Sequence, residues 1–253
     1  MKNRRVLISQ AQPTDRNSSF FKLAEKFNFE ISFTPLFALK PISAKEFMQQ
    51  RINILDHSAI FFSSKNSIDF FFSISNQLKV EIPKEIKYFC MTELLVNYLQ
   101  KHIVLRKRKI FVPKKNSVDI FDLFIKHKEE KFLVVGSQNR KKEITDYLME
   151  NGIDFSEAML FRVLSNDISE LVPDDFGMLV FFSPADVKSL AENFPTFRQN
   201  ETIIACFGPS TISAATEAGL KVDIEAPQPQ VPSMSSAIEL YMKTKSLKSE
   251  APH

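Results

Sequence analysis

Short apolar runs alternate with amphipathic stretches along most of the chain. The runs at 59–62 and 178–182 have the length of buried strands, and a serine follows each of them directly. Elsewhere apolar residues recur at helical spacing, as at Phe20, Leu23 and Phe27. Because strands and helices alternate regularly and no hairpin dipeptide directly joins two predicted strands, the pattern predicts an α/β protein with parallel sheets.

The same patterns predict where the individual elements lie. Strands are expected at residues 5–9, 29–34, 59–62, 86–90, 109–112, 132–135, 158–164, 178–182, 202–207 and 221–225. Helices are expected at 20–27, 44–54, 68–78, 92–101, 118–126, 140–151, 186–193, 212–218 and from 233 or 235 to about 243. Turns between a strand and the next helix are expected at 63–67, 136–139, 183–185 and 208–211.

An internal echo divides the chain. The segment 61–63 followed by a helix resembles 181–183 followed by a helix, and in each copy the next strand ends in a cysteine. Two similar domains fit this repetition better than one ten-stranded sheet. The expected domains are therefore residues 1–34 plus 174–243, which form a discontinuous first domain, and 42–162, with linkers at 35–41 and 163–173 and a disordered tail at 244–253.

Composition excludes several classes of protein. With 253 residues, of which 44% are hydrophobic and 25% charged, the chain has globular values and is not disordered as a whole. Lys and Arg number 33 against 30 Asp and Glu, and a net charge of +3 is too small for a dedicated nucleic-acid binder. The apolar runs fall well short of the ~20 residues of a membrane helix. The apolar part of the basic N-terminus is also too short for a signal peptide.

The cysteines and histidines argue against a metal or redox site. Cys90 and Cys206 end predicted strands and are expected to be buried, reduced thiols, which favours the cytoplasm. The four histidines are isolated from one another, so we expect no zinc site. Asp56 and His57 precede a predicted strand and are expected to be surface caps.

Hydroxyl residues follow nearly every predicted strand. Ligands of open parallel sheets bind beyond the carboxyl ends of the strands. There, the first amides of a helix and its dipole attract anions. Any one of these hydroxyl residues is explained as a helix N-cap. For the whole set, an anion-binding site is as good an explanation as capping. The strand ends carry Ser9, Gln10, Ser63, Ser64, Thr92, Gly136, Ser137, Ser183, Pro184, Gly208, Pro209, Ser210 and Thr211.

Other motifs narrow the choice of function. The chain has no dinucleotide-binding glycine motif, no P-loop and no nucleophile elbow. Its densest charge is a basic cluster that we interpret as a solvated edge, with a patch for polyanions as the alternative. This cluster consists of Lys101, His102, Arg106, Lys107, Arg108, Lys109, Lys114 and Lys115.

One turn and several collinear segments carry a resemblance to a known family. The turn 208–211, with Ala214, Ala215 and the segment 217–220 after it, resembles the most recognisable motif of uroporphyrinogen-III synthases. The resemblance extends to about residue 243. Segments that agree in order and spacing lie at 6–9, 62–64, 140–152, 161–162, 182–184 and 226–227.

This resemblance implies a fold and an activity. The fold is two flavodoxin-like α/β domains joined by a two-stranded linker, with the active-site cleft between them. The implied reaction closes hydroxymethylbilane, a linear tetrapyrrole with eight carboxylates, to uroporphyrinogen III in haem biosynthesis. Ring D is inverted and water is lost, without a metal or an organic cofactor. Since such a substrate suits the strand ends, we expect substrate binding at Ser63, Ser64, Thr92, Gly136, Ser137, Ser183, Pro184, Gly208, Ser210 and Thr211.

The chain departs from the family pattern in several places. Gln10 stands where an Arg is frequent, Thr92 replaces a Gly, and Leu95 replaces a Thr. Phe161 stands at the position of the family's tyrosine, which is its favoured acid for water loss, and Val163 replaces a Thr. Phe has no proton to donate, so the acid must be another group, water or the substrate. Thr211 is the one candidate catalytic residue.

Two alternatives stay open beside the synthase. One is a non-catalytic protein of the same fold that binds a tetrapyrrole or another polycarboxylate. The other is an unrelated two-domain binder that closes over its ligand by a hinge. For the synthase we expect a cytoplasmic monomer with no nucleic-acid or membrane partner, and we leave open a transient contact with hydroxymethylbilane synthase.

Overall fold

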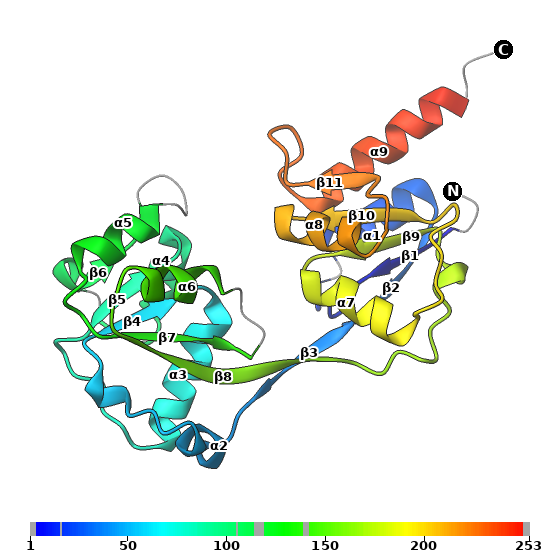
Figure 1. Ribbon diagram of the computed structural model, residues 1–253. Coiled ribbons are helices and arrows are strands. Elements are labelled where there is room, and N and C mark those ends of the chain that lie inside the picture. Colours follow the sequence, from blue (N-terminus) through cyan, green and yellow to red (C-terminus); the bar gives the residue numbers. More distant parts are fainter. Residues whose placement is uncertain (1–3, 16, 105, 114–118, 139–141, 250–253) are drawn as a thin grey trace. The chain divides into compact units, whose positions relative to one another are not determined.

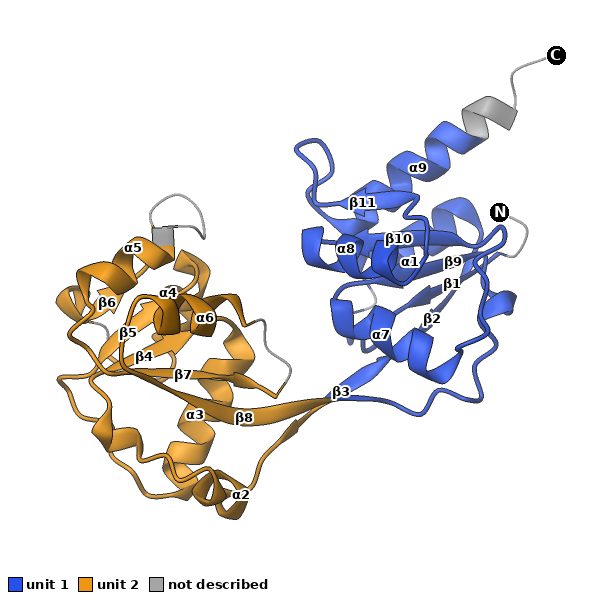
Figure 2. Ribbon diagram, in the orientation of Figure 1, with its two compact units in different colours: residues 1–38, 164–253 blue, residues 39–163 orange. Residues whose placement is uncertain are grey.

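The chain divides into two compact units (Figure 2). The computed structural model describes residues 4–15, 17–104, 106–113, 119–138 and 142–249. Unit 1 comprises residues 1–38 and 164–253, and unit 2 comprises residues 39–163. Unit 1 is therefore assembled from both ends of the chain, whereas unit 2 is one continuous segment.

Unit 1 contains a five-stranded parallel sheet (Figure 1). Its strands are β1 (Arg5–Ile8), β2 (Glu30–Phe33), β9 (Met178–Phe181), β10 (Ile203–Phe207) and β11 (Ile224–Ala226). Their spatial order is β11-β10-β9-β1-β2. Counted by order of appearance this is 2-1-3-4-5, the flavodoxin arrangement, whose ligand-binding switch point lies between β1 and β9.

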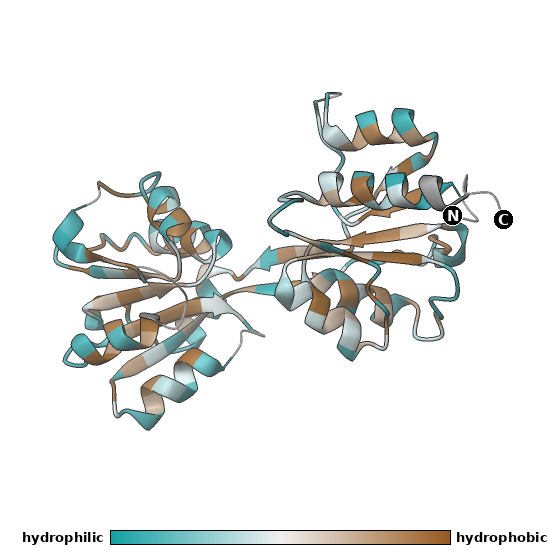
Figure 3. Ribbon diagram, turned by 90° about the horizontal axis from the view of Figure 1, so that it is seen from above, coloured by the Kyte–Doolittle hydropathy of each residue, from teal (hydrophilic) through white to brown (hydrophobic). Residues whose placement is uncertain are grey.

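Helices cover both faces of this sheet. They are α1 (Ser19–Phe27), α7 (Pro184–Asn193), α8 (Pro209–Glu217) and α9 (Met234–Ser249). On one face Val6 and Ile8 pack with Leu23 of α1 and Ile238 of α9. On the other, Leu7 packs with residues of α7 and α8. Strands β9 and β10, inside the sheet, are apolar throughout because both of their faces are buried, whereas the edge strands β2 and β11 each carry a Glu. Figure 3 shows strands that are mainly brown or white and helices that carry both brown and teal.

Unit 2 contains a six-stranded sheet. Its strands are β3 (Phe37–Pro41), β4 (Ala59–Phe62), β5 (Lys87–Cys90), β6 (Ile110–Phe111), β7 (Phe132–Ser137) and β8 (Phe155–Ser165). The spatial order is β3-β8-β7-β4-β5-β6, and β4 to β8 pair in parallel. If these five strands are renumbered 1 to 5 in chain order, starting with β4, their spatial order from the β6 edge is 3-2-1-4-5. Unit 2 has the Rossmann strand order in this part and so differs from unit 1. Its switch point lies between β4 and β7, because β5 and β6 follow on one side of β4 and β7 and β8 on the other.

The helices of unit 2 also cover both faces of their sheet. They are α2 (Ala44–Gln49), α3 (Lys65–Gln77), α4 (Glu93–Leu99), α5 (Asp119–Lys126) and α6 (Glu143–Glu150). Phe62 packs in a core with residues of α2, α3 and α4. Phe61 points to the other face and joins residues of α5 and α6. Short 3₁₀ turns complete the two units at Ile54–Asp56, Lys107–Lys109 and Pro173–Asp175.

The chain passes between the units inside two neighbouring strands, β3 and β8. The amide of Ile42 donates to the carbonyl of Leu160 (3.0 Å), and the amide of Asn166 donates to the carbonyl of Leu36 (2.9 Å). The partner number falls as the residue number rises, so β3 and β8 run antiparallel. The expected linkers, 35–41 and 163–173, contain the two points where the units divide.

Side chains of the segment 43–50, which contains α2, hold β8 within unit 2. The side-chain amide of Gln50 both donates to the carbonyl of Met159 (2.9 Å) and accepts from its N–H (2.8 Å). Glu46 accepts hydrogen bonds from Ser43 and from the Arg162 guanidinium (2.8 Å each). These bonds, those of Ser43 first, lower the pKa of the Glu46 carboxyl group to about 2. The amide and carboxylate together fix the helix against the strand.

The predicted α/β class with two parallel-stranded sheets is confirmed, and the differences lie at element ends. Helices α3, α7 and α8 begin at Lys65, Pro184 and Pro209, earlier than the expected 68, 186 and 212. The segments predicted as turns therefore contain first helical turns, and in α7 and α8 a proline at the first helical position suits the start. Strand β7 also runs on through Gly136 and Ser137, with a bulge between them.

Two further expectations are wrong. The tail is helical as far as Ser249, because no proline or glycine interrupts the segment after Met234. His57, which comes just before β4, is not a surface cap, since its side chain is buried at 5% exposure. Lys114 and Lys115 of the basic cluster, and the start of the helix predicted at residue 140, lie outside the described residues.

Candidate functional site

In unit 2, the carboxyl ends of three adjacent strands bring predicted site residues together. Strand β4 lies between β7 and β5, with Phe62 opposite Val135 and Cys90. The amide of Met91 donates to the carbonyl of Phe62 (3.0 Å). The segments that follow these three residues therefore share one edge of the sheet. They carry Ser63, Ser64, Thr92, Gly136 and Ser137.

The two serines after β4 have different tasks. Ser64 caps α3: its hydroxyl accepts from the amide of Ser67 (3.1 Å), and its own amide donates to the Ser67 hydroxyl (3.2 Å). Ser63 is exposed, and its hydroxyl makes no hydrogen bond within the described part of the chain. Ser64 is thus committed to the helix, whereas Ser63 is available to a ligand.

The remaining unit 2 positions differ in what they can offer. Thr92 is exposed and precedes α4, but its side chain does not cap the helix. Leu95 is buried in the core under α4, so the family's threonine is replaced here by a packing residue. Gly136 is buried inside β7 and brings only backbone groups to the edge, while Ser137 is half-buried at the strand's last position.

In unit 1, a corresponding set of strand ends meets. Strand β9 lies between β1 and β10, with Val180 opposite Ile8 and Phe181 opposite Cys206. The amide of Ser9 donates to the carbonyl of Val180 (3.0 Å). Ser9 and Gln10, the start of α7, and the start of α8 are consequently neighbours at this edge. Ser183, Pro184, Gly208, Ser210 and Thr211 come together here.

A buried carboxyl group, Asp186, organises the start of α7. Its side chain is 1% exposed, and Oδ2 accepts from the amides of Phe182 (3.0 Å) and Ser183 (2.9 Å) and from the Ser183 hydroxyl (3.2 Å). The other oxygen, Oδ1, has no hydrogen-bond partner in the described structure. Burial raises the pKa of Asp186, while the Phe182 amide and the neighbouring Ser9 hydroxyl oppose the rise.

Asp186 was not among the residues predicted for the site. The signal was present, because a serine followed three positions later by an acidic residue is a capping-box pattern. The same cap changes how the two repeated segments of the internal echo align. Ser64 and Ser183 occupy equivalent cap positions, and β4 and β9 end at Phe62 and Phe181. The matching segments are therefore 62–64 and 181–183, one residue away from the predicted alignment, and Phe182 takes the place of Ser63.

The start of α8 depends on a glycine. Gly208 has φ 87° and ψ 148°, a conformation that side chains with a Cβ rarely adopt. Its amide donates to the carbonyl of Ala226 (2.6 Å), and Pro209 takes the first helical position. Ser210 is then exposed on the first turn, while Thr211 is buried at 1% exposure. The turn thus presents Ser210 and backbone amides to the sheet edge.

The comparisons with known proteins agree with this arrangement. The family model described as uroporphyrinogen-III synthase HemD matches residues 18–236, well over half of the chain. The chain belongs to the uroporphyrinogen-III synthase family. The match contains every strand of both sheets except β1, and all the strand ends described above except the one after β1. A search of curated proteins found none that matches.

Solved structures agree on the fold. A mutant uroporphyrinogen III synthase from the extremely thermophilic bacterium Thermus thermophilus is 16% identical, with a TM-score of 0.66, covering 97% of this chain and 99% of that one. The uroporphyrinogen-III synthetase from Helicobacter pylori is 18% identical, with a TM-score of 0.58, covering 95% and 98%. At these identities the likeness shows the fold alone.

Family membership gives the chemical class of the activity. Uroporphyrinogen-III synthases are cyclising hydro-lyases of haem biosynthesis, and the chain is an enzyme of this class. The resemblance found in the sequence is thereby confirmed. The alternative, a non-catalytic binder of the same fold, receives no support from the comparisons.

In this synthase Phe161 is a packing residue. It lies on β8, is 6% exposed, and its ring stands 4.9 Å from that of Phe70 on α3. Its backbone carbonyl accepts from the amide of Gln138 (3.2 Å). The position of the family's tyrosine is therefore part of the unit 2 core and offers no proton.

The thiols of the synthase are chemically quiet. Cys90 and Cys206 are free and buried, as expected from their places at strand ends. Burial raises the pKa of each thiol to about 12. Neither thiol ionises near neutral pH, so neither is suited to nucleophilic chemistry.

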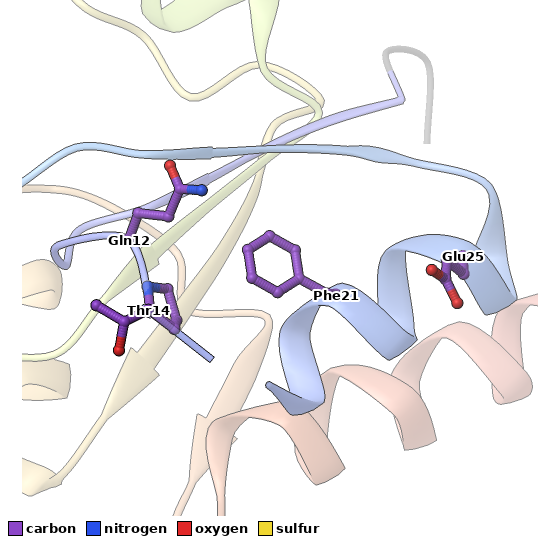
Figure 4. A pocket seen from close by; sticks show the side chains of 5 residues that line it. Gln12, Thr14, Phe21 and Glu25 are labelled. Atoms are coloured by element: carbon purple, nitrogen blue, oxygen red, sulfur yellow. The ribbon is translucent and has the colours of Figure 1, made fainter. Parts of the chain in front are cut away.

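A pocket of about 550 Å³ opens in unit 1 between α1 and the segment after β1 (Figure 4). In Figure 4 the Phe21 ring points from α1 toward the segment that carries Gln12 and Thr14, with Glu25 one turn farther along. These residues were not predicted as a site, because no recognisable motif marks them.

In the described part of the chain, no helix is both long and apolar enough to cross a membrane.

Proposed function

We propose that this synthase acts on hydroxymethylbilane, closing it to uroporphyrinogen III with inversion of ring D and loss of water. One observation carries the proposal. In each unit, helix N-termini and uncommitted hydroxyls are gathered at the carboxyl edge of a parallel sheet. A substrate with eight carboxylates can be held by such repeated hydrogen-bond donors.

The helix starts supply most of the attraction. The first amides of an α-helix lack partners within the helix, and the dipole places partial positive charge there. Helices α3, α7 and α8 each start directly beyond a strand. We expect their amides to receive acetate and propionate carboxylates, since such bonds to charged acceptors are short and strong.

The hydroxyls divide into two groups. Ser64 and Ser183 hold the helix starts in shape through Ser67 and Asp186. Ser63 and Ser210 are exposed, and their side-chain hydroxyls make no hydrogen bonds with described residues, so these are the hydroxyls proposed to contact the substrate. Thr211 is buried, which makes it a support for the turn that carries Ser210.

The chemistry then rests on orientation. The hydroxymethyl carbon at the ring A end of the bilane becomes electrophilic as its hydroxyl leaves as water, and the ring D carbon that bonds to it decides which isomer forms. Attack by the free α-carbon of ring D gives isomer I. Attack by the substituted α-carbon gives a spiro intermediate, in which the bond to the ring C bridge breaks and re-forms at the free α-carbon, with loss of its proton. Holding the chain so that attack occurs at the inverting position of ring D, through a spiro intermediate, is catalysis by proximity. Since Phe161 has no proton, the acid for water loss is another group, water or the substrate.

The decisive experiment separates the two product isomers. Porphobilinogen is fed through a hydroxymethylbilane-forming enzyme in the presence of this protein, and the oxidised uroporphyrins are resolved chromatographically. Because the bilane closes spontaneously to isomer I, the reaction contains its own blank. We expect mainly isomer III. Isomer I alone, from folded protein, would contradict the proposal and favour a non-catalytic binder.

A second experiment tests the residues. The Ser63→Ala, Ser210→Ala double variant is expected to raise KM for the bilane by about tenfold, as two hydrogen bonds to charged carboxylates are removed. Ser213→Ala is the matched control, because Ser213 is an exposed serine on α8 that bonds Glu217 (2.7 Å) away from the helix start. Equal KM values for the double variant, the control and the wild type would remove the hydroxyls from the proposal.

The proposal also covers the compartment, the oligomeric state and the partner of the enzyme. We propose a cytoplasmic monomer that receives its unstable substrate from hydroxymethylbilane synthase, with transient contact between the two. The buried, unreactive thiols suit a reducing compartment.

A further inference from the structure

A second cavity, of about 630 Å³, lies in unit 2 at the opposite edge of the sheet from the strand ends described above. It opens between α3, the segment at 80–86 and the segment at 102–110. Ile86 directly precedes β5 and Ile110 opens β6, so the cavity lies at the amino ends of these strands. Ser63 and Thr92 stand at the carboxyl ends. The cavity is therefore separate from the proposed bilane-binding edge.

The interior of this cavity is largely apolar. Its volume falls within the range of small-molecule sites, which are lined mainly by hydrophobic side chains with a few polar groups. The Phe72 ring, from α3, lies at one wall and stacks on the His102 ring at 4.7 Å. The apolar lining consists of Phe72, Val80, Ile82, Pro83, Ile86, Ile103, Val104 and Ile110.

The mouth of the cavity carries an excess of positive charge. Its charged residues are Glu81, Lys84, Arg106 and Lys109, and His102 also lines it. Lys109 donates to the carbonyl of Glu85 (2.8 Å), and His102 pairs with Asp69 (2.9 Å). Lys84 and Arg106 are exposed, and their side chains form no hydrogen bond or ion pair with any described residue. Part of the basic cluster found in the sequence is thus gathered at an apolar cavity.

One buried polar side chain within the cavity lacks a partner. Tyr88 is 6% exposed and lines the cavity, and its ring stacks on that of Phe62 in the core. Its hydroxyl makes no hydrogen bond with the described residues and is not one of their fully buried unpartnered atoms, so it is accessible from the cavity. Burial raises its pKa to about 12, so the group remains a donor at neutral pH. A molecule bound in the cavity can accept this hydrogen bond in place of water.

We propose that this cavity binds a small amphipathic organic anion, with an apolar body and a carboxylate or sulfonate group. The apolar body packs against Phe72, Ile103 and Ile110. The anionic group lies near Lys84 and Arg106, and an oxygen acceptor takes the hydrogen bond of the Tyr88 hydroxyl. The site is independent of the bilane reaction, and its occupancy is measurable without turnover.

The test uses two fluorescent probes that differ in charge. Anilinonaphthalene sulfonate carries an aromatic body and one sulfonate, whereas phenylnaphthylamine is its uncharged counterpart. We expect the full-length protein to bind the sulfonate with increased fluorescence. The Lys84→Glu, Arg106→Glu double variant should weaken sulfonate binding by about tenfold and leave the neutral probe unaffected. Tyr88→Phe should weaken binding by about threefold.

Two controls locate the probe. Lys126→Glu, Lys128→Glu makes the same charge change at exposed lysines in and after α5, and should bind the sulfonate like the wild type. Val80→Trp fills the cavity and should abolish binding of both probes, with an unchanged thermal midpoint showing that the fold persists. Equal weakening by the α5 variant, or undiminished binding by Val80→Trp, would overturn the proposal, as would failure of the wild type to bind the sulfonate.

Discussion

The buried carboxyl group of Asp186 joins two amides and a hydroxyl at the strand end where β9 meets α7. A single residue thereby decides the shape of the β9–α7 turn, which the sequence pattern alone presents as an ordinary cap. Burial raises the pKa of Asp186, so its carboxyl group is more easily protonated than that of an exposed aspartate.

This gives a prediction with a matched pair of variants. Asp186→Ala leaves the amides of Phe182 and Ser183 without their acceptor, and should lower the free energy of unfolding by about 1–3 kcal/mol. Asp186→Asn keeps an acceptor oxygen and removes a buried charge, so it should remain within about 1 kcal/mol of the wild type. Urea unfolding at pH 7 measures both. Equal losses in the two variants would show that charge, not the hydrogen bonds, holds the turn.

His57 is a second buried residue with a consequence for stability. Its Nδ1–H donates to the carbonyl of Asn53 (2.9 Å), and Nε2 is buried without a partner in the described structure. Burial lowers the pKa of His57 below its ordinary value of 6.5. The unfolded chain therefore binds the proton more readily, and folding stability falls as the pH drops below about 6.5.

The prediction concerns the difference between two pH values. The wild type should have a lower thermal midpoint at pH ~5.5 than at pH ~7.5. His57→Gln should be less stable at both values but should lose part of the difference, because one proton-linked group is gone. Scanning calorimetry of both proteins decides the matter. An unaltered difference in the variant would mean that other groups, such as His127, whose pKa burial also lowers, cause it.

At the scale of elements, the start of α8 depends on backbone conformation and not on space. A Cβ built on Gly208 meets no atom within 4 Å, yet φ 87° with ψ 148° belongs almost only to glycine. Any other residue at position 208 would strain the turn that carries Ser210 and Thr211. Gly152, after α6, has φ 65°, a left-handed conformation that Asn also tolerates.

We therefore predict different outcomes at the two glycines. Gly208→Ala should cost about 1–3 kcal/mol of stability and raise KM for the bilane, since the turn must distort. Gly152→Asn should cost less than about 1 kcal/mol and leave KM unchanged. Chemical unfolding and steady-state kinetics of both variants check this. Normal kinetics in folded Gly208→Ala would show that the turn's shape is not needed for binding.

At the scale of the whole molecule, unit 2 has the properties of an independent domain. It is a continuous segment with a core on each face of its sheet, and its size is ordinary for a domain. Unit 1 needs both ends of the chain, because β1 and β2 complete a sheet whose other strands follow residue 177.

A fragment of residues 36–166, which retains β3 and β8, should fold alone. We expect a cooperative thermal transition and dispersed amide signals in solution spectra. The complementary fragment 164–253, lacking β1 and β2, should not fold because it exposes the side of β9 that normally pairs with β1. A non-cooperative transition in the 36–166 fragment would mean that unit 2 depends on unit 1.

Much of this architecture can be predicted from the sequence. The inner parallel strands, such as β4 and β9, are buried on both faces and so form short apolar runs, and the amphipathic helices show their own spacing. The strand–helix alternation thus predicts the α/β class, and the collinear segments around 208–211 indicate the family. The strand ends that carry Ser63, Thr92 and Ser210 follow from the same pattern.

The remaining features depend on contacts between distant residues. The Ser64 cap is local, since its partner Ser67 lies three positions later, but whether the neighbouring Ser63 hydroxyl stays available depends on which side chains the fold brings near it. The burial of Asp186, the packing of Phe161 on Phe70, and the cavity around Tyr88 likewise join segments far apart in sequence. Local patterns determine which elements form, whereas the packing between elements determines which of their polar groups remain free for a ligand.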